Sequence, residues 1–445
     1  MRPISLRSLK YLGVQYLLRE HTPSLDPAPP ATERNHFVMQ SSRLHAIVFL
    51  VCCLAILALF HMLDANPSGG AKGDLDRFHL PSIDTYRSEA LIDALRAQDS
   101  AMGPLFYTLA STLDLSATEL RLVNLFLLLS AAGLAIIALS HVLRADSQAR
   151  RSVPFLFAFA IFILNPWTLG PALWGNPDTL TLFFAMAALV VLVKGASWPS
   201  ILASGILMAL AVLTRQSAIA LLAPLLAVMW MHPQGFPRPS RILPEAALLC
   251  TPPLLALAFL VWAWGGLTPP GFAGHAAPSL VPVSLVIAYF GLLLAPVVVA
   301  RLYTERAWAT PLTGLLAGGL FLLAALGTGS LPAKGGGAAG KLLEMGMAGP
   351  WLWGGLYALG SMALALLARV APLQGLLLML FFLSYLAMGD IFYQKYLEPY
   401  VAIAALATAM GLTPKQVFGL RTYALYVLLL YGGFLVLALY VYQGE

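Results

Sequence analysis

The chain has 445 residues, of which 59% are hydrophobic and only 10% are charged. A soluble domain carries about 25% charged residues, so this chain lacks the side chains to cover itself with a polar surface. The net charge of +6 does not indicate a nucleic-acid partner, because the basic residues are scattered between apolar runs. The composition therefore predicts an all-α polytopic membrane protein.

Residues 1–43 come first and are mostly polar, with several arginines and one lysine. This stretch is far longer than the basic region that opens a cleavable signal peptide. We therefore expect a basic, partly flexible tail on the cytoplasmic side of the membrane.

Apolar runs then recur along the rest of the chain. A membrane helix needs about 20 mostly apolar residues, and on that criterion we predict a bundle of about 11 to 13 transmembrane helices. The candidate spans are residues 44–63, 120–143, 153–167, 174–193, 198–213, 217–231, 243–264, 281–300, 308–328, 350–368, 371–388, 399–412 and 422–442. Residues 44–280 are expected to form one transmembrane module and residues 281–445 a second.

The basic residues give these spans an orientation. With the N-terminus in the cytoplasm, alternation through the spans places about two thirds of the 26 lysine and arginine residues on the cytoplasmic side. This bias satisfies the positive-inside rule. The long loop of residues 64–119 then lies on the outer face.

That loop is unusually polar for this chain. It contains "GDLDRFHLP", residues 73–81, in which two carboxylates, a guanidinium and an imidazole lie within nine positions. Downstream, Ile83, Leu91, Ile92 and Leu95 recur among charged residues, a pattern that predicts an amphipathic helix along the membrane surface. Long loops with structure of their own are commonly functional.

A second group of polar residues lies at the predicted outer ends of spans. Ionisable groups at membrane depth are costly and tend to line a cavity or to pair with one another. The group comprises Arg121, Asn124, Asn176, Asp178, Arg215, Gln216, His275, Asp390, Lys395 and Glu398.

These polar residues also have structural interpretations. Asp76 is equally typical of a solvated loop residue, and Asp178 is equally typical of an acidic partner for Arg121 or Arg215. Lys395 lies among tyrosines, as in an ordinary membrane-interface belt. Their shared location is what favours a functional site.

Several of these segments resemble one family in their order along the chain. They are "DRFHLP", "MGPLFYTLA", "LRLVN", "WGNPDTLTLFF", "LTRQSAI", "WAWGGLTPPGFAGH" and "QKYLEPY". Together they resemble glycosyltransferases of the GT-C superfamily, most closely the dolichyl-phosphate-glucose alpha-1,2-glucosyltransferase family. The likeness consists of scattered short matches over residues 73 to about 280 and at 393–400.

The resemblance implies an enzyme that takes a sugar from a polyprenyl-phosphate donor and has an acidic catalytic residue in the first outer loop. Asp76 stands where the family has glutamate, whereas Leu75 stands where it has aspartate and Asp74 is displaced by one position. The resemblance therefore implies Asp76 as the catalytic base, with Asp74 as the alternative. His275 stands where the family has the histidine of a glycine-rich turn, but the aspartate that precedes it in the family is absent here. Glu398 stands where the family has an apolar residue.

The residues and the resemblance together assign further roles. A departing phosphate needs cations, and arginine is the side chain best suited to engage two of its oxygens. Donor phosphate or sugar is expected to contact His79, Arg121, Arg215, Gln216, His275, Lys395 and Tyr396, with Asn124, Asp178 and Glu398 in supporting positions. One base and one displacement predict inversion at the anomeric carbon, and we expect neither a metal nor a cofactor.

The main alternative is a transporter or flippase of lipid-linked sugars, because such proteins also have many spans and intramembrane charges. Repeats between the two halves of the chain, typical of transporters, are not evident. The acceptor is left open among glycan, lipid and protein. The Ala-, Leu- and Pro-rich composition favours a bacterial inner membrane with a periplasmic active face, and hence an undecaprenyl donor.

Overall fold

The structure, a computed structural model, is helical in the regular elements that it describes. It describes residues 75–98, 100, 102–143, 149–195, 197–230, 239–271, 280–305, 312–314, 316–320, 323, 348–385, 398–412 and 419–443. The chain divides into two compact units, Met1–Pro67 and Ser68–Glu445, and every described residue belongs to the second. The predicted tail and first span lie outside the described residues, and the module boundary at residue 280 stays a prediction.

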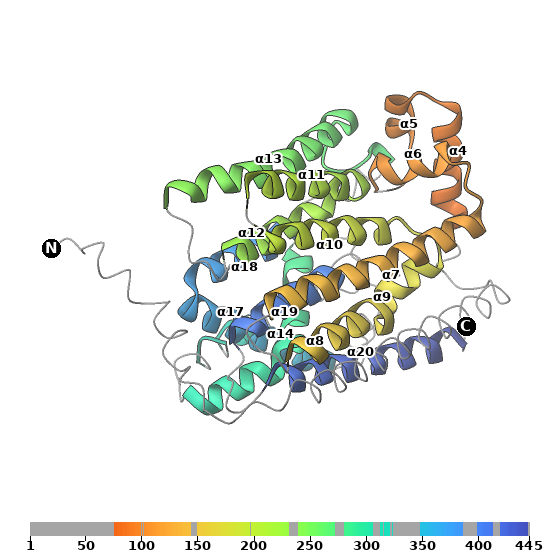
Figure 1. Ribbon diagram of the computed structural model, residues 1–445. Helices are drawn as coiled ribbons and strands as arrows, with labels where there is room; N and C mark the ends of the chain where they lie inside the picture. Colours follow the sequence, from red (N-terminus) through yellow and green to blue (C-terminus); the bar gives the residue numbers. More distant parts are fainter. Residues whose placement is uncertain are drawn as a thin grey trace, which may run out of the picture. The chain divides into compact units, whose positions relative to one another are not determined.

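Figure 1 shows the arrangement of the elements. In chain order they are η2 (Leu75–His79), α4 (Leu80–Ser88), α5 (Leu91–Ala97), α6 (Pro104–Thr112), α7 (Ala117–Val142), α8 (Ala149–Ala158), η3 (Phe159–Leu164), α9 (Pro166–Leu173), α10 (Asp178–Lys194), α11 (Trp198–Thr214), η4 (Gln216–Leu221), α12 (Leu222–Trp230), α13 (Pro239–Trp264), α14 (Leu280–Glu305), α17 (Ala348–Val370), α18 (Pro372–Ser384), α19 (Glu398–Leu412) and α20 (Leu420–Gln443).

Four of the described helices are long and apolar enough to cross a membrane. They are the stretches Ala117–Val142, Arg241–Trp264, Pro282–Tyr303 and Trp351–Arg369, and the bent pair Ser152–Leu164 and Pro166–Leu173 makes a fifth if it counts as one span. This confirms an all-α membrane protein. The larger number of spans expected from the sequence stays a prediction.

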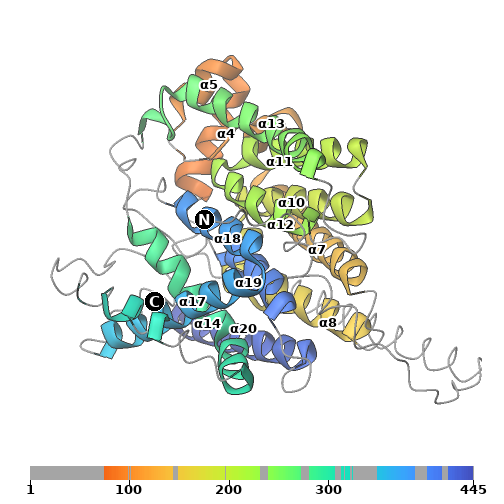
Figure 2. The ribbon, with the colours of Figure 1, turned by 90° about the vertical axis from the view of Figure 1, so that its left-hand side faces the viewer.

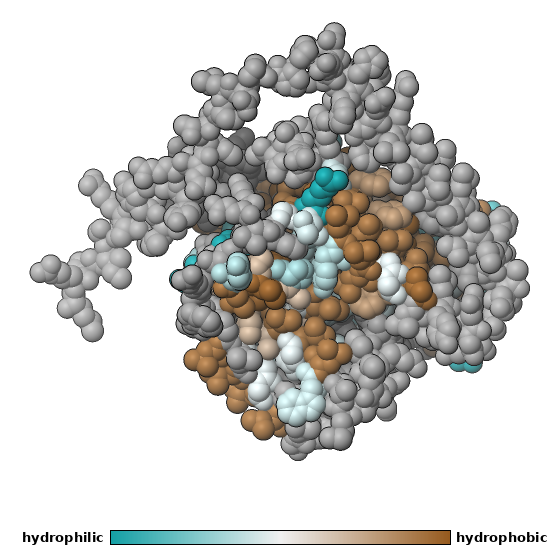
Figure 3. Space-filling view, turned by 90° about the horizontal axis from the view of Figure 1, so that it is seen from below, coloured by the Kyte–Doolittle hydropathy of each residue, from teal (hydrophilic) through white to brown (hydrophobic). Residues whose placement is uncertain are grey.

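Large apolar side chains on the outside of the bundle agree with a membrane setting. Phe126 of α7, Leu243 of α13 and Leu429 of α20 are each about 70% exposed or more. Apolar side chains also form large continuous areas of the described surface on the face drawn in Figure 3. Exposed leucine and phenylalanine are stable against lipid tails, whereas water would penalise them.

The predicted span 153–167 is wrong in its end and in its shape. The helix of α8 and η3 stops at Leu164, and α9 leaves at an angle of 56°. Pro166 lacks the N–H that would continue the helix, and the Asn165 side chain accepts a hydrogen bond from Trp167 N to begin the next one. Thr168 Oγ1 then donates to the freed carbonyls of Ile161 and Phe162.

The first half of the described bundle is a stack of packed helices. In both ribbon views α10 lies between α7 and α11, and α13 lies beyond α11 (Figures 1 and 2). α7 and α10 run in the same direction, because Leu120 and Leu180 share one cluster at their first turns and Ala138 meets Val193 near their last. The close approach of α11 to α13 requires Gly205, where a Cβ would lie 2.8 Å from Leu249 O.

Residues 75–112 form four short elements at the end of the stack where α7 begins (Figure 1). The single amphipathic helix predicted here is wrong in detail, because extended backbone at Glu89 and Ala90 divides it into α4 and α5. The turn lets Ile83 and Leu95 both be buried. α5 is tied to the end of α13, since Trp264 Nε1 donates to Leu95 O at 3.1 Å.

Candidate active site

The structure brings together several of the polar segments that the sequence singled out. Gly175, in the turn before α10, has a positive φ of 75° and leaves room for its neighbours. A Cβ at this position would lie 3.6 Å from Leu75 of η2 and 3.6 Å from Leu120 and Arg121 of α7. The segments "LDRFH", "LRLVN" and "WGNPD" therefore lie close together at one end of the bundle, whereas their place on the outer face stays a prediction.

η2 carries the predicted catalytic residue. It is a π-helical turn in which Leu75 and His79 are buried, while Asp76, Arg77 and Phe78 between them are exposed. A π-turn disrupts regular helical bonding and is often found at functional sites. Asp76 thus lies on the surface and does not cap α4, whose N-cap is His79. Asp74 lies outside the described residues.

His79 is held by a buried hydrogen-bond network. Its Nδ1 lies 2.8 Å from the hydroxyl of Tyr107, and that hydroxyl donates to Ser100 Oγ at 2.7 Å. Beside it, Tyr86 donates to Gln98 Oε1 at 2.9 Å, and the Gln98 amide donates to the carbonyls of Ser100 and Met102. The role of His79 in donor binding stays a prediction.

Tyr107 is a residue of this region that sequence reasoning missed. It lies in the quoted segment "MGPLFYTLA" and is completely buried between His79, Tyr86 and Phe106. A buried tyrosine needs a partner for its hydroxyl, and this requirement, together with its place in the quoted segment, was the available signal.

Asp178 and Arg215 form a buried ion pair. Asp178 is in the first turn of α10, Arg215 caps the end of α11, and their side chains are 9% and 6% exposed. This confirms the interpretation in which Asp178 is the acidic partner of Arg215. The end of α11 is also linked to the loop of residues 75–112, because Gly103 N donates to Thr214 O at 2.9 Å.

Further buried polar side chains come from the neighbouring elements. Asn124, two turns into α7, is fully buried and donates to Leu120 O at 3.0 Å, and Asn176, in the turn before α10, is also buried. Tyr400 of α19 is buried close enough to Arg215 and Ser217 for that charge and that hydroxyl to act on its phenol. Residues far apart in the sequence therefore share one polar region.

The remaining predicted residues divide into two groups. Arg121 is half-buried beside the Gly175 turn, and Gln216 opens η4 directly after Arg215. The residues His275, Lys395 and Tyr396 lie outside the described residues, as does the side chain of Glu398 at the start of α19.

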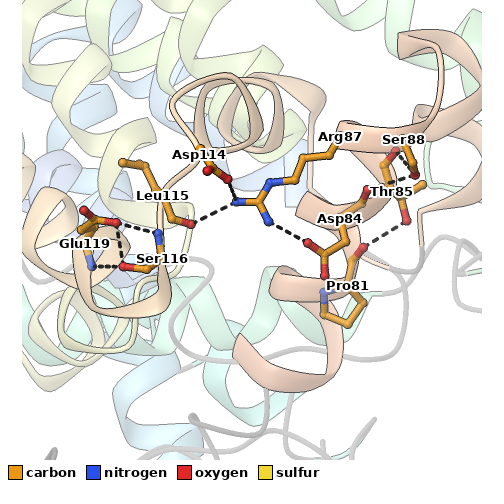
Figure 4. Close-up of polar contacts among 9 residues, drawn as sticks. All are labelled: Pro81, Asp84, Thr85, Arg87, Ser88, Asp114, Leu115, Ser116 and Glu119. Atoms are coloured by element: carbon orange, nitrogen blue, oxygen red, sulfur yellow. Dashed lines mark hydrogen bonds and ion pairs between the residues drawn. The ribbon is translucent and has the colours of Figure 1, made fainter.

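An exposed ion-pair network fixes α4 against the turn between α6 and α7. Arg87 donates to Asp84 at 2.8 Å, pairs with Asp114 at 2.7 Å and reaches Leu115 O at 3.5 Å (Figure 4). Next to it, Ser116 and Glu119 form a capping box that begins α7. These contacts hold the loop elements at the end of the bundle.

Within the described ranges, no three His, Cys, Asp or Glu side chains lie close enough together to hold a metal ion. Comparison of the whole chain with protein-family models, with curated proteins and with solved structures finds no match. The chemistry of the residues at the polar end of the bundle is therefore the basis for a functional proposal.

Proposed function

We propose that the chain is a membrane glycosyltransferase that moves a sugar from a polyprenyl-phosphate donor to an acceptor on the outer face of a bacterial inner membrane. The observation that carries this proposal is that η2, which carries the exposed Asp76, lies against the same turn as Arg121 at one end of a membrane helix bundle. Leu75, the neighbour of Asp76, and Arg121 of α7 both contact the Gly175 turn. The two charges come from different elements but lie in one neighbourhood.

The proposed reaction is a single displacement with Asp76 as general base. The Asp76 carboxylate takes the proton of the acceptor hydroxyl, and the acceptor oxygen forms a bond to the anomeric carbon. The bond from that carbon to the phosphate oxygen breaks, and the electron pair leaves with the lipid phosphate. Attack from the face opposite the leaving group inverts the anomeric centre.

We assign Arg121 to the leaving phosphate and Arg215 to the support of the site. Arg121 is half-buried beside the Gly175 turn, against which Leu75 of η2 also lies. The Arg215 side chain is only 6% exposed and forms a buried ion pair with Asp178, so it is poorly accessible to a donor.

One observation favours a flippase or transporter of lipid-linked sugars instead. The Asp178–Arg215 pair lies among apolar helices, and ionisable groups inside a membrane bundle commonly mark a transport pathway. This alternative requires no exposed catalytic carboxylate, so the two functions differ in their dependence on Asp76.

The test uses the purified protein in lipid with a panel of short-chain polyprenyl-phosphate sugars and crude membrane acceptors. Loss of a general base costs about 10²- to 10⁴-fold in rate, so Asp76→Asn is expected to lose turnover by that factor while still binding donor. The matched control is Asp93→Asn, which removes an exposed carboxylate from α5 of the same loop. It is expected to keep the wild-type rate.

The other outcomes separate the alternatives. Loss of turnover in Asp74→Asn, with Asp76→Asn active, keeps the enzyme class and moves the base to Asp74. Donor that is bound but never consumed by the wild type, together with its movement across a vesicle membrane, supports the flippase.

A further inference from the structure

The π-turn η2 is anchored at both ends and free in its middle. Leu75 at its start is 1% exposed and packs on the Gly175 turn, and His79 at its end is 4% exposed. The three residues between these anchors are exposed. The position of Asp76 therefore depends on how firmly the two anchors hold.

The apolar anchor and the polar anchor differ in precision. Leu75 is held by van der Waals contact, which keeps it close to the Gly175 turn but does not fix the orientation of its side chain. His79 is held by a hydrogen bond of 2.8 Å to Tyr107, which also fixes the plane and direction of the ring. The polar anchor therefore sets the orientation of the turn.

The direction of the protons follows from the chemistry of the network. Tyr107 has a single hydroxyl proton and donates it to Ser100. Its oxygen can therefore accept a hydrogen bond from Nδ1 of His79, 2.8 Å away. Removal of the Tyr107 hydroxyl would delete this buried hydrogen bond, which is costly.

The rest of the loop is held independently of this bond. Arg87 fixes the far end of α4 to the turn between α6 and α7 through Asp114 and Leu115. Tyr86, whose ring centroid lies 5.5 Å from that of Tyr107, donates to Gln98. Burial raises the pKa of the Tyr86 hydroxyl, so that phenol also stays a donor. Loss of the Tyr107 hydroxyl is therefore expected to loosen η2 without detaching α4.

We infer that Tyr107 is a positioning residue: through its hydrogen bond to His79 it holds the η2 turn and keeps Asp76 in a fixed place at the end of the bundle. The structural part stands on the geometry of the network alone. The catalytic part rests on the proposed transferase function.

The structural part is tested with a spin label on η2. The label is attached at Arg77→Cys in the full-length protein with the three native cysteines replaced by serine, and its motion is measured by electron paramagnetic resonance. Tyr107→Phe is expected to shorten the correlation time of the label. Tyr86→Phe is the matched control, because it removes a partly buried hydroxyl from the same cluster that bonds to Gln98 and not to His79, and it is expected to leave the label unchanged.

Two results would overturn the structural part. One is a label whose motion is the same in Tyr107→Phe as in the parent protein, and the other is an equal loosening in Tyr86→Phe. If Tyr107→Phe yields no folded protein, His79→Gln removes the ring from the other side of the bond and is judged by the same two criteria.

The catalytic part is tested by steady-state kinetics on the same variants. A misplaced catalytic group costs up to about a hundredfold in rate, so Tyr107→Phe is expected to lower kcat about ten- to a hundredfold with the donor KM unchanged. Tyr86→Phe is expected to keep the wild-type kcat. A looser label with an unchanged kcat would overturn the positioning of Asp76, whereas a wild type that consumes no donor would overturn the transferase function and leave the anchoring of η2 intact.

Discussion

The loop elements of residues 75–112 and the helix pair α14 and α17 are held together by different interactions. In residues 75–112, buried side chains such as His79, Tyr107 and Gln98 bond to one another and to backbone carbonyls. Between α14 and α17, Gly291 faces Leu356 O and Gly360 faces Ile287 O so closely that neither position has space for a Cβ. Directional side-chain hydrogen bonds fix the loop elements, whereas close backbone contact fixes α14 against α17.

The difference follows from the solvent of each region. Lipid tails are as apolar as the helix surfaces, so burial of apolar area drives helix association weakly in a membrane, and small residues that allow close packing take its place. The loop elements are predicted to face water, where apolar burial and side-chain hydrogen bonds can act together. The Asp178–Arg215 pair, which is polar but lies within the bundle, is the exception to this division.

The largest effect is expected at that exception. Arg215→Met leaves the Asp178 carboxylate buried without its partner, and removal of one member of a buried pair costs about 3 to 5 kcal/mol. The free energy of unfolding in mixed micelles is expected to fall by this amount. The double variant Asp178→Leu/Arg215→Met is expected to regain most of the loss, and a double variant no more stable than the single one would contradict this account.

A smaller effect is expected from overpacking the helix pair. Gly360→Ala forces a methyl group against Ile287 O, and overpacking costs about 1 to 3 kcal/mol. Gly355→Ala on the same helix is the control, because a Cβ there meets nothing within 4 Å. Thermal unfolding in detergent measures both, and similar melting temperatures for the two variants would show that close contact does not hold this pair.

The smallest effect is expected at the exposed contact of the loop. Arg87→Ala removes the ion pairs with Asp84 and Asp114, whose side chains are 68% and 87% exposed. Exposed pairs contribute about 0 to 1 kcal/mol and are screened by salt. The melting temperature is expected to change little, and the difference from wild type should vanish at about 1 M salt, where the Debye length is about 3 Å.

Local pattern predicted the helices and much of the polar site. Apolar runs were sufficient for α7, α13, α14 and α17, because hydropathy over about 20 residues depends only on neighbouring residues. Counting the spans in alternation also predicted that η2, the start of α7 and the Gly175 turn lie at the same end of the bundle, and these three elements do lie close together. The break at Asn165–Pro166 was visible as a helix-stopping dipeptide but was missed within an apolar run.

By itself, the sequence determined that this is an all-α membrane protein, because composition and hydropathy express this property directly. Only the tertiary structure decided which partner each polar residue has. The sequence offers Arg121 and Arg215 as partners for Asp178, and the packing of α10 beside α11 brings Arg215 into an ion pair with it. In the same way, Tyr107 meets His79 only because α6 packs against α4, a contact between residues 28 positions apart that no local pattern contains.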